Sequence, residues 1–448
     1  MLGHRLIGDL DENLFVLAIH ARGRYHLAMQ LAPAGDRAVL VELGNVTASQ
    51  LHAAASYARS LPGVVKVVPG HSSLLVVWDD VEPSFDGWPA LDDVERETKP
   101  ARAIRVAFDG EDLAEFLALH ALTRDAFLAR VATLTLTARY LGFRAGFAYL
   151  DGWPEEWAMP RRATSRPVQR GSFAIAGNVA GFYPIDSPGG WNLLGHTDED
   201  LVDGIDAGER LRIDVVASAP RPPAHVFERP RLDFDIIQSP LVVVTTTPFD
   251  DVLGRIATRA VAGNVTLLEC AMAGPRIRFH RDAVVAWCDV ELRVDRVRAG
   301  EERAFGRVAG GLRGYLAIGD REGVIEAMPE RSERRVIHAI RGPHDVGLEE
   351  VECEVTPQLN RVGVRLRPLR ELRIDIPADL RSIGMQCGSV QLHPDGSLVA
   401  MGPDHPVTGG YLQPMTVITS ERWKLAQLLP GERVTFMNRI DSRRAPRS

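Results

Sequence analysis

The chain has 448 residues, of which 45% are hydrophobic and 25% are charged, and its formal net charge is −7. This length predicts two to four domains, and the acidic balance without any basic block argues against nucleic acid as a partner. No apolar stretch approaches the 18 residues of a membrane span, no signal peptide opens the chain, and the four cysteines are widely spaced; we therefore expect a cytoplasmic protein that does not cross a membrane.

The first predicted domain, residues 1–102, has the pattern of a small α+β unit. Residues 38–43, 64–68 and 73–78 are rich in apolar and β-branched side chains and are predicted to be strands. Residues 47–61 have apolar side chains at helical spacing and begin with a threonine that can cap a helix.

The second predicted domain, residues 103–218, opens with a strand at 104–108. A helical stretch is expected from about 112 to 137, and short strands with Gly and Pro turns follow it. The proline cluster in residues 219–234 cannot lie inside a helix or a sheet, so we predict an interdomain linker there.

The last predicted domain, residues 235–448, consists mostly of short strands separated by Gly and Pro turns. Helices are expected only at 249–262 and 420–429. Many short strands with few helices are typical of β-barrels and sandwiches. The whole chain is therefore predicted to be mainly β, with an α+β part.

A set of three short motifs occurs twice in the chain, in the same order. Each copy has a Gly-Ser pair, then Gly-Gly followed by an aromatic residue, and then Gly-Glu-Arg. The two copies are Gly171-Ser172, Gly189-Gly190-Trp191 and Gly208-Glu209-Arg210, and Gly388-Ser389, Gly409-Gly410-Tyr411 and Gly431-Glu432-Arg433. Three ordered elements seldom recur together by chance, so we predict a duplicated domain.

The Gly-Gly motifs have two interpretations. The backbone N–H groups around Gly189 and Gly190 can point into a concavity that suits a carboxylate, a phosphate or an oxyanion. Alternatively, the glycines supply a positive φ at a barrel corner, and the aromatic residues Trp191 and Tyr411 belong to the core.

Charged residues in the same regions are further candidates. Arg161 and Arg162 can clamp a carboxylate or a phosphate, or they form a solvated face. Asp404 and His405 can act as an acid/base pair, although an aspartate in a polar loop often only forms a turn.

Together these motifs resemble two families, the B and C subunits of 5-oxoprolinase, which are also called allophanate hydrolase subunits 1 and 2. The first half is similar to the B subunit, whose family includes sporulation-kinase inhibitors, through Leu141-Gly142-Phe143, Gly146 to Leu150, Pro160-Arg161-Arg162 and Ser187 to Trp191. The second half is similar to the C subunit through Gly263-Asn264, Leu268-Glu269, Gln391, Asp404, Thr408 to Tyr411 and Ala426-Gln427-Leu428. Their order in one chain is similar to the carboxyltransferase part of urea amidolyase.

The resemblance implies tandem cyclophilin-like β-barrels and a small-molecule amide or lactam substrate. It implies a component of an ATP-dependent 5-oxoprolinase, which opens 5-oxoproline to glutamate, or of a related carboxyltransferase. We predict Asp404 and Arg161 as the catalytic residues. The predicted substrate-binding residues are Arg162, Tyr149, Gly189, Gly190, Thr408, Gly409, Gly410, Tyr411 and Gln391.

The implied cofactors need other proteins. The sequence contains neither a G-x-x-x-x-G-K-[ST] phosphate loop nor a Met-Lys-Met biotin-attachment motif. ATP is therefore expected to be handled by a partner that resembles the A subunit of 5-oxoprolinase, and biotin, if it is used, to arrive on a separate carrier. No metal ligand set is predicted.

Departures from the families support an alternative. Relatives of the B subunit usually carry His and Tyr where Val131 and Leu136 stand here, and Pro where Ala145 stands. A polar loop of the C subunit is missing, because residues 244–247 run almost directly into Pro248, and the usual Ser-Asp-Arg-Met-Gly is Leu-Asn-Arg-Val-Gly at 359–363. Positioned polar groups supply much of an enzyme's rate. The alternative is a catalytically degenerate regulatory or binding protein of the kinase-inhibitor type.

Overall fold

The structure is a computed structural model. It describes residues 15–17, 20–21, 24–25, 29–85, 88, 100–144, 146–223, 232–239, 241–377 and 380–438. The predicted linker at 219–234 is described only at its two ends, and Ala145 lies outside the described residues. None of the helices in these ranges is both long and apolar enough to cross a membrane.

The N-terminal sheet has the strand order β1-β4-β5-β7-β6. Its strands are β1 (Phe15–Leu17), β4 (Met29–Gly35), β5 (Ala38–Glu42), β6 (Val64–Pro69) and β7 (Ser73–Trp78); β2 (His20–Ala21) pairs with β3 (Arg24–Tyr25). Helix α1 (Ala48–Ser60) covers one face and begins at Thr47, which forms a capping box with Gln50. The predicted strands and helix of this unit are confirmed.

The first closed barrel has the strand order β10-β13-β12-β15-β8-β16-β9. Its strands are β8 (Arg102–Ala107), β9 (Thr135–Leu141), β10 (Ala148–Asp151), β12 (Ser172–Ala176), β13 (Val179–Phe182), β15 (Asn192–His196) and β16 (Arg210–Val216); β11 (Arg166–Val168) pairs with β14 (Ser187–Gly189) outside the barrel.

The helical stretch predicted at 112–137 is wrong as a single helix. It forms two short helices, α2 (Leu113–Leu119) and α3 (Arg124–Val131), and its end belongs to β9. Ala121 takes a left-handed φ of 50°, which breaks the first helix, and Thr123 caps the second. The β-branched threonines 135 and 137 then favour a strand.

A middle unit of two sheets lies between the barrels in the sequence. Its strands are β17 (Phe234–Gln238), β21 (Arg276–Phe279) and β24 (Glu302–Ala304) in one sheet, and β18 (Val242–Val244), β20 (Thr266–Ala271), β25 (Arg313–Gly319), β22 (Ala283–Cys288) and β23 (Leu292–Val297) in the other. The unit also has helix α4 (Asp251–Arg259) and a pair formed by β19 (Val261–Ala262) and β26 (Arg321–Glu322). The helix predicted at 249–262 is shorter than expected, since β19 occupies its last residues.

The second closed barrel lies within residues 336–438. Its strands are β27 (Val336–Arg341), β28 (Glu350–Leu359), β29 (Gly363–Pro368), β31 (Ser389–Leu392), β32 (Leu398–Met401), β34 (Leu412–Val417) and β35 (Arg433–Asn438); β30 (Ile383–Gly384) pairs with β33 (Thr408–Gly409) outside the barrel. Helix α5 (Arg422–Gln427) precedes β35.

The two barrels have the same topology. Read in the same direction, the second has the order β29-β32-β31-β34-β27-β35-β28, so β8 to β16 correspond one by one to β27 to β35. In each barrel the first and last strands pair in parallel. The fold class predicted from the sequence, tandem barrels preceded by a small α+β unit, is confirmed.

The last echoed motif forms the same turn in both barrels. Glu209 accepts from the N–H of Asp206 at 2.9 Å, and Glu432 accepts from the N–H of Leu429 at 3.0 Å. Each glutamate also pairs with an arginine at the start of its barrel, Arg102 in the first and Arg334 in the second. This part of the repeat therefore has a structural role.

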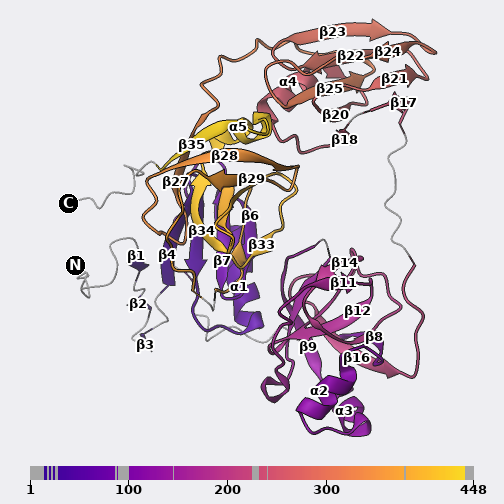
Figure 1. Cartoon of the computed structure of the whole chain (residues 1–448), viewed down its shortest axis with the longest axis vertical. Helices are drawn as coiled ribbons and strands as arrows, with labels where there is room; N and C mark the ends of the chain where they lie inside the picture. The colour runs from indigo at the N-terminus through magenta and orange to yellow at the C-terminus, as the bar shows by residue number, and fades with distance from the viewer. Residues whose placement is uncertain are drawn as a thin grey trace.

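The N-terminal sheet packs against the second barrel (Figure 1). The face of the N-terminal sheet opposite α1 carries Ala38, Leu40 and Leu75, which pack with Ile383 next to the second barrel. Asp36 accepts hydrogen bonds from the backbone and side chain of Thr419. The N-terminal sheet therefore bridges the two barrels, since α1 also contacts β9 of the first.

Candidate functional site

The two Gly-Gly motifs occupy equivalent positions, at the ends of β14 and β33. None of their four glycines has a positive φ, so the predicted reason for the glycines at a barrel corner is wrong. Trp191 packs against a buried cluster, as that interpretation expected, whereas Tyr411 is exposed. Close approach explains two of them: a Cβ at Gly189 would overlap the Tyr183 hydroxyl, and one at Gly409 would lie 2.5 Å from Gln391 Nε2. Both motifs let a neighbouring side chain reach the backbone.

The second motif contacts the first barrel directly. The Thr408 hydroxyl donates to the carbonyl of Leu141 at 3.0 Å, and Thr408 is buried. A Cβ at Gly142 would overlap Thr408 Oγ1 and lie 3.4 Å from Tyr149 Cε2. The Leu-Gly-Phe motif of the first half thus meets the Thr-Gly-Gly motif of the second.

Aromatic rings surround this contact on the side of the first barrel. Tyr149 stacks on Tyr140, with ring centroids 4.4 Å apart, and meets the edge of Trp191 at 5.7 Å. Burial raises the pKa of Tyr149, and burial also raises the pKa of Tyr140 to about 12. Both phenols are therefore neutral donors at physiological pH.

Arg161 is the cation beside these rings. It forms no hydrogen bond or ion pair with any residue that the structure describes, and a Cβ at Gly190 would lie 2.9 Å from its Nε. Its charge is close enough to Tyr149 and Tyr183 to oppose the rise in their pKa values. A guanidinium in this position, next to neutral phenols, suits a carboxylate ligand.

The segment from residue 380 to 384 joins this contact to the N-terminal sheet. Ile383 pairs with Gly409, and the carbonyl of Ser382 accepts from the N–H of His71 at 2.7 Å. The Ser382 side chain hydrogen-bonds to Tyr140. Gly410 lies against the same segment, because its Cβ would be 3.5 Å from Ser382 Oγ. Three units of the protein therefore meet around residue 382.

Three of the predicted site residues have partners elsewhere. Arg162 donates to Asp112 at 2.8 Å, and Asp404 accepts two hydrogen bonds from Arg361, at 2.7 and 2.8 Å. Tyr411 stacks on His393 with centroids 4.2 Å apart. Gln391 is buried next to Gly409, with its Nε2 2.9 Å from Met385 Sδ. The structure thus brings together Arg161, Tyr149, Gly190, Thr408, Gly409 and Gln391.

Other motif residues of the second half form a buried ionic network. Glu269 accepts from Arg313 at 3.0 Å and from Arg361 at 2.7 Å, and both Glu269 and Arg313 are 4% exposed. Gln427 donates to Asp250 at 2.8 Å. These contacts join the middle unit to the second barrel. The network therefore has a structural role, which is to stabilise that junction.

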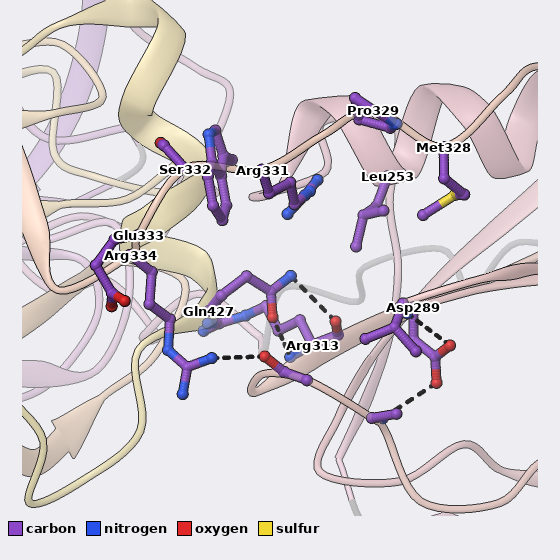
Figure 2. A pocket seen from close by; sticks show the side chains of 14 residues that line it. Leu253, Asp289, Arg313, Met328, Pro329, Arg331, Ser332, Glu333, Arg334 and Gln427 are labelled. Atoms are coloured by element: carbon purple, nitrogen blue, oxygen red, sulfur yellow. Dashed lines mark hydrogen bonds between the residues drawn. The ribbon is translucent and has the colours of Figure 1, made fainter.

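A cavity of about 490 Å³ opens at the same junction. Leu253, Met328 and Pro329 lie together at one end of it, and Arg334 and Gln427 lie at the other (Figure 2). Sequence reasoning missed this cavity, because its lining comes from distant segments. Within the described residues, no three His, Cys, Asp or Glu side chains gather in a way that could hold a metal ion.

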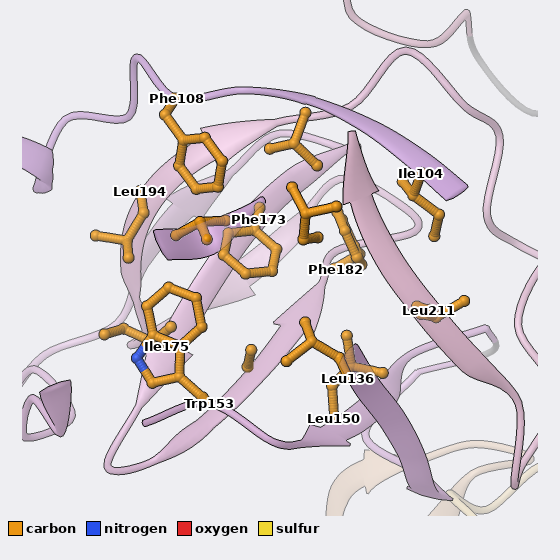
Figure 3. Close-up of a cluster of buried hydrophobic side chains, with 14 of the residues drawn as sticks. Ile104, Phe108, Leu136, Leu150, Trp153, Phe173, Ile175, Phe182, Leu194 and Leu211 are labelled. Atoms are coloured by element: carbon orange, nitrogen blue, oxygen red, sulfur yellow. The ribbon is translucent and has the colours of Figure 1, made fainter. Parts of the chain in front are cut away.

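Two of the departures from the families lie in the core of the first barrel. Val131 and Leu136 are fully buried, and Leu136 points into the barrel interior with Leu150 and Phe173 (Figure 3). Apolar side chains at these positions fill a packed interior. In this chain the two positions are structural.

Comparisons with known proteins give the family. Residues 29–209 match the model of the carboxyltransferase domain, subdomain C and D, and residues 322–438 match subdomain A and B. The B subunit of 5-oxoprolinase from Haemophilus influenzae is 33% identical over 189 residues, which span 39% of this chain and 89% of that protein. The chain belongs to this carboxyltransferase-domain family. The family resemblance expected from the sequence, with both parts fused in one chain, is confirmed.

Two further relatives agree. The B subunit of 5-oxoprolinase from Bacillus subtilis is 30% identical over 197 residues, which span 38% of this chain and 82% of that protein. The crystal structure of the protein TTHA0988 has a TM-score of 0.74 and 24% identity, and the match covers 90% of this chain and 99% of that one. This likeness shows that the two proteins share a fold. The shared fold extends over nearly all of the length of both chains.

Proposed function

We propose that this carboxyltransferase-domain protein is a component of an ATP-dependent 5-oxoprolinase, which hydrolyses 5-oxoproline to glutamate with a separate partner of the A-subunit type. The contact between Thr408 and Leu141 supports this, because it joins the two echoed halves at one place. A lactam carbonyl is unreactive, and enzymes activate such groups with preorganised donors. Arg161 and the neutral phenols of Tyr149 and Tyr140 are donors of this kind.

A related urea-amidolyase-type carboxyltransferase would use the same framework. In that reaction biotin would arrive on a separate carrier. In both cases ATP is handled by the partner, since the sequence has no phosphate loop.

Reconstitution tests the proposal. The chain is combined with a protein of the A-subunit type, and phosphate release and glutamate formation are measured with and without 5-oxoproline. We expect turnover only in the complex, with negligible ATP hydrolysis by the single chain. Arg161→Met should reduce turnover by at least about 10-fold, whereas Arg296→Met, at an exposed position of the middle unit, should leave it unchanged. Robust oxoproline-dependent turnover by the single chain would contradict the proposal.

A regulatory binding protein is the second candidate. The observation that favours it is that two of the expected charged site residues, Asp404 and Arg162, are already held in ion pairs. In this case the chain binds its partner with full affinity, and the complex has no oxoproline-dependent activity.

A further inference from the structure

A cavity of about 440 Å³ lies between the N-terminal sheet and the second barrel. This volume is within the range of small-molecule sites. Its lining comes from five separate segments, and the polar members are Gln30, Glu42, Ser72, His344 and Arg381. The cavity is next to the second Gly-Gly motif, because Ile383, which also lines it, pairs with Gly409.

Glu42 is a charged residue on a face of β5 that otherwise carries apolar side chains. Side chains of a strand alternate between two faces, so Glu42 shares a face with Ala38 and Leu40, which pack toward the second barrel. Burial raises the pKa of Glu42, and no described residue donates a hydrogen bond to its carboxyl group. A half-buried carboxyl group without a donor is costly for the free protein unless a ligand or water satisfies it.

His344 presents a fixed donor. Its Nδ1 accepts a hydrogen bond from the backbone N–H of Gln413 at 2.9 Å. A backbone N–H can only donate, so Nδ1 carries no proton, and the neutral ring keeps its proton on Nε2. Burial lowers the pKa of His344, which agrees with a neutral ring.

Arg381 supplies the positive charge. Its Nη1 donates to Ser72 Oγ at 3.2 Å, and no ion pair within 4.0 Å joins it to any described carboxylate. Its charge nevertheless lowers the pKa of Glu42 against the effect of burial, so the two groups lie near each other. The remaining guanidinium N–H groups are available to a ligand.

We propose that this cavity binds a small molecule that carries a carboxylate together with an amide-type N–H and C=O. Arg381 pairs with the carboxylate, Glu42 accepts from the N–H, and His344 Nε2 donates to the carbonyl oxygen. The carboxyl group of Glu42 disfavours polyphosphates, and the charged lining disfavours apolar ligands. The choice of 5-oxoproline as the probe rests on the proposed function.

Calorimetric titration of the full-length chain tests the role of Arg381. Arg381→Met should weaken 5-oxoproline binding by roughly 10- to 100-fold, the range for a lost hydrogen bond to a charged group. It should not change the affinity for 2-pyrrolidinone, which has the lactam but no carboxylate. The matched control is Arg373→Met, because Arg373 is on the same connecting segment with its side chain 89% exposed.

The role of Glu42 is tested with a ligand that lacks the N–H. The lactone analogue of 5-oxoproline keeps the carboxylate and the carbonyl. Glu42→Ala should weaken 5-oxoproline binding by roughly 5- to 20-fold and should leave lactone binding unchanged or stronger. Equal losses for both ligands would contradict the assignment of Glu42.

The outcomes separate this inference from the proposed function. If 5-oxoproline does not bind the wild-type chain at millimolar concentration, or binds Arg381→Met equally well, the inference is overturned. If binding depends on Arg381 but the reconstituted complex has no turnover, the inference stands and the proposed function fails. If the complex turns over and 5-oxoproline binds the Arg381→Met chain as tightly as the wild type, the proposed function stands and the inference fails.

Discussion

Gly142→Ala should separate the two barrels at their point of contact. The added Cβ would overlap Thr408 Oγ1, so Thr408 must move away and its hydrogen bond to Leu141 is lost. Overpacking of this kind costs about 1–3 kcal/mol, and the hydrogen bond adds about 1 kcal/mol. We therefore expect the free energy of unfolding to fall by about 2–4 kcal/mol. Gly306→Ala is the control, since a Cβ at Gly306 meets nothing within 4 Å.

A double variant tests the reason for this loss. Thr408→Ala removes the hydroxyl, and the nearest remaining atom to the new Cβ at residue 142 is then the Cβ of residue 408, at 3.3 Å. That contact is tight but tolerable, so the double variant should cost about 1–2 kcal/mol, no more than Thr408→Ala alone. Urea unfolding gives the free energy of unfolding of the wild type, the two single variants and the double variant. The reconstituted complex should lose activity with Gly142→Ala and regain it in the double variant. Additive losses, or a Gly142→Ala protein as stable as Gly306→Ala, would refute the argument.

Other predictions concern charged groups. Glu269→Gln should lower the free energy of unfolding by about 3–5 kcal/mol because it leaves buried cations without their partner. Glu302→Gln, whose partners are exposed, should leave the urea midpoint nearly unchanged; similar urea midpoints for the two variants would contradict this. Asp404→Asn should cost about 1 kcal/mol, since Arg361 keeps its other partner; full activity would exclude catalysis by Asp404. Burial lowers the pKa of His405 to about 4, so the unfolded chain binds a proton near pH 6.5 before the folded chain does. Wild type should therefore lose up to about 3 kcal/mol relative to His405→Asn as the pH falls from 6.5 to 4, and parallel pH profiles would argue against a half-buried neutral ring.

Much of the fold could be predicted because local patterns agree with it. The capping threonine at residue 47, the strand patterns of the N-terminal sheet and the echoed motifs all reappear in the structure. The division of the stretch at 112–137 could not be predicted from apolar spacing. It depends on the left-handed backbone at Ala121 and on the pairing of β9 with β16, which are tertiary effects.

The candidate site was only partly predictable. The Gly-Gly motifs mark segments that meet in the structure, but Gly189 and Gly409 are explained by neighbouring side chains, which a sequence does not place. Glu42 and His344 carry no sequence motif, although a glutamate on a core-facing position of an apolar strand is a signal that could have been used. In the sequence Arg361 belongs only to a departure from the family pattern, because its role depends on contacts with residues 92 and 43 positions away.

The duplicated barrels have become unequal around their shared motif. In the first barrel the Gly-Gly segment pairs with β11, where Arg166 is bound to Asp112, and leaves Arg161 beside aromatic rings. In the second barrel the equivalent segment pairs with β30, and the residues next to β30 contact the N-terminal sheet and the first barrel. Two copies that each bound a ligand alone would be expected to keep similar neighbours. The copies here present different groups to one junction, so a ligand bound there would contact both halves, which gives a physical reason for joining them in a single chain.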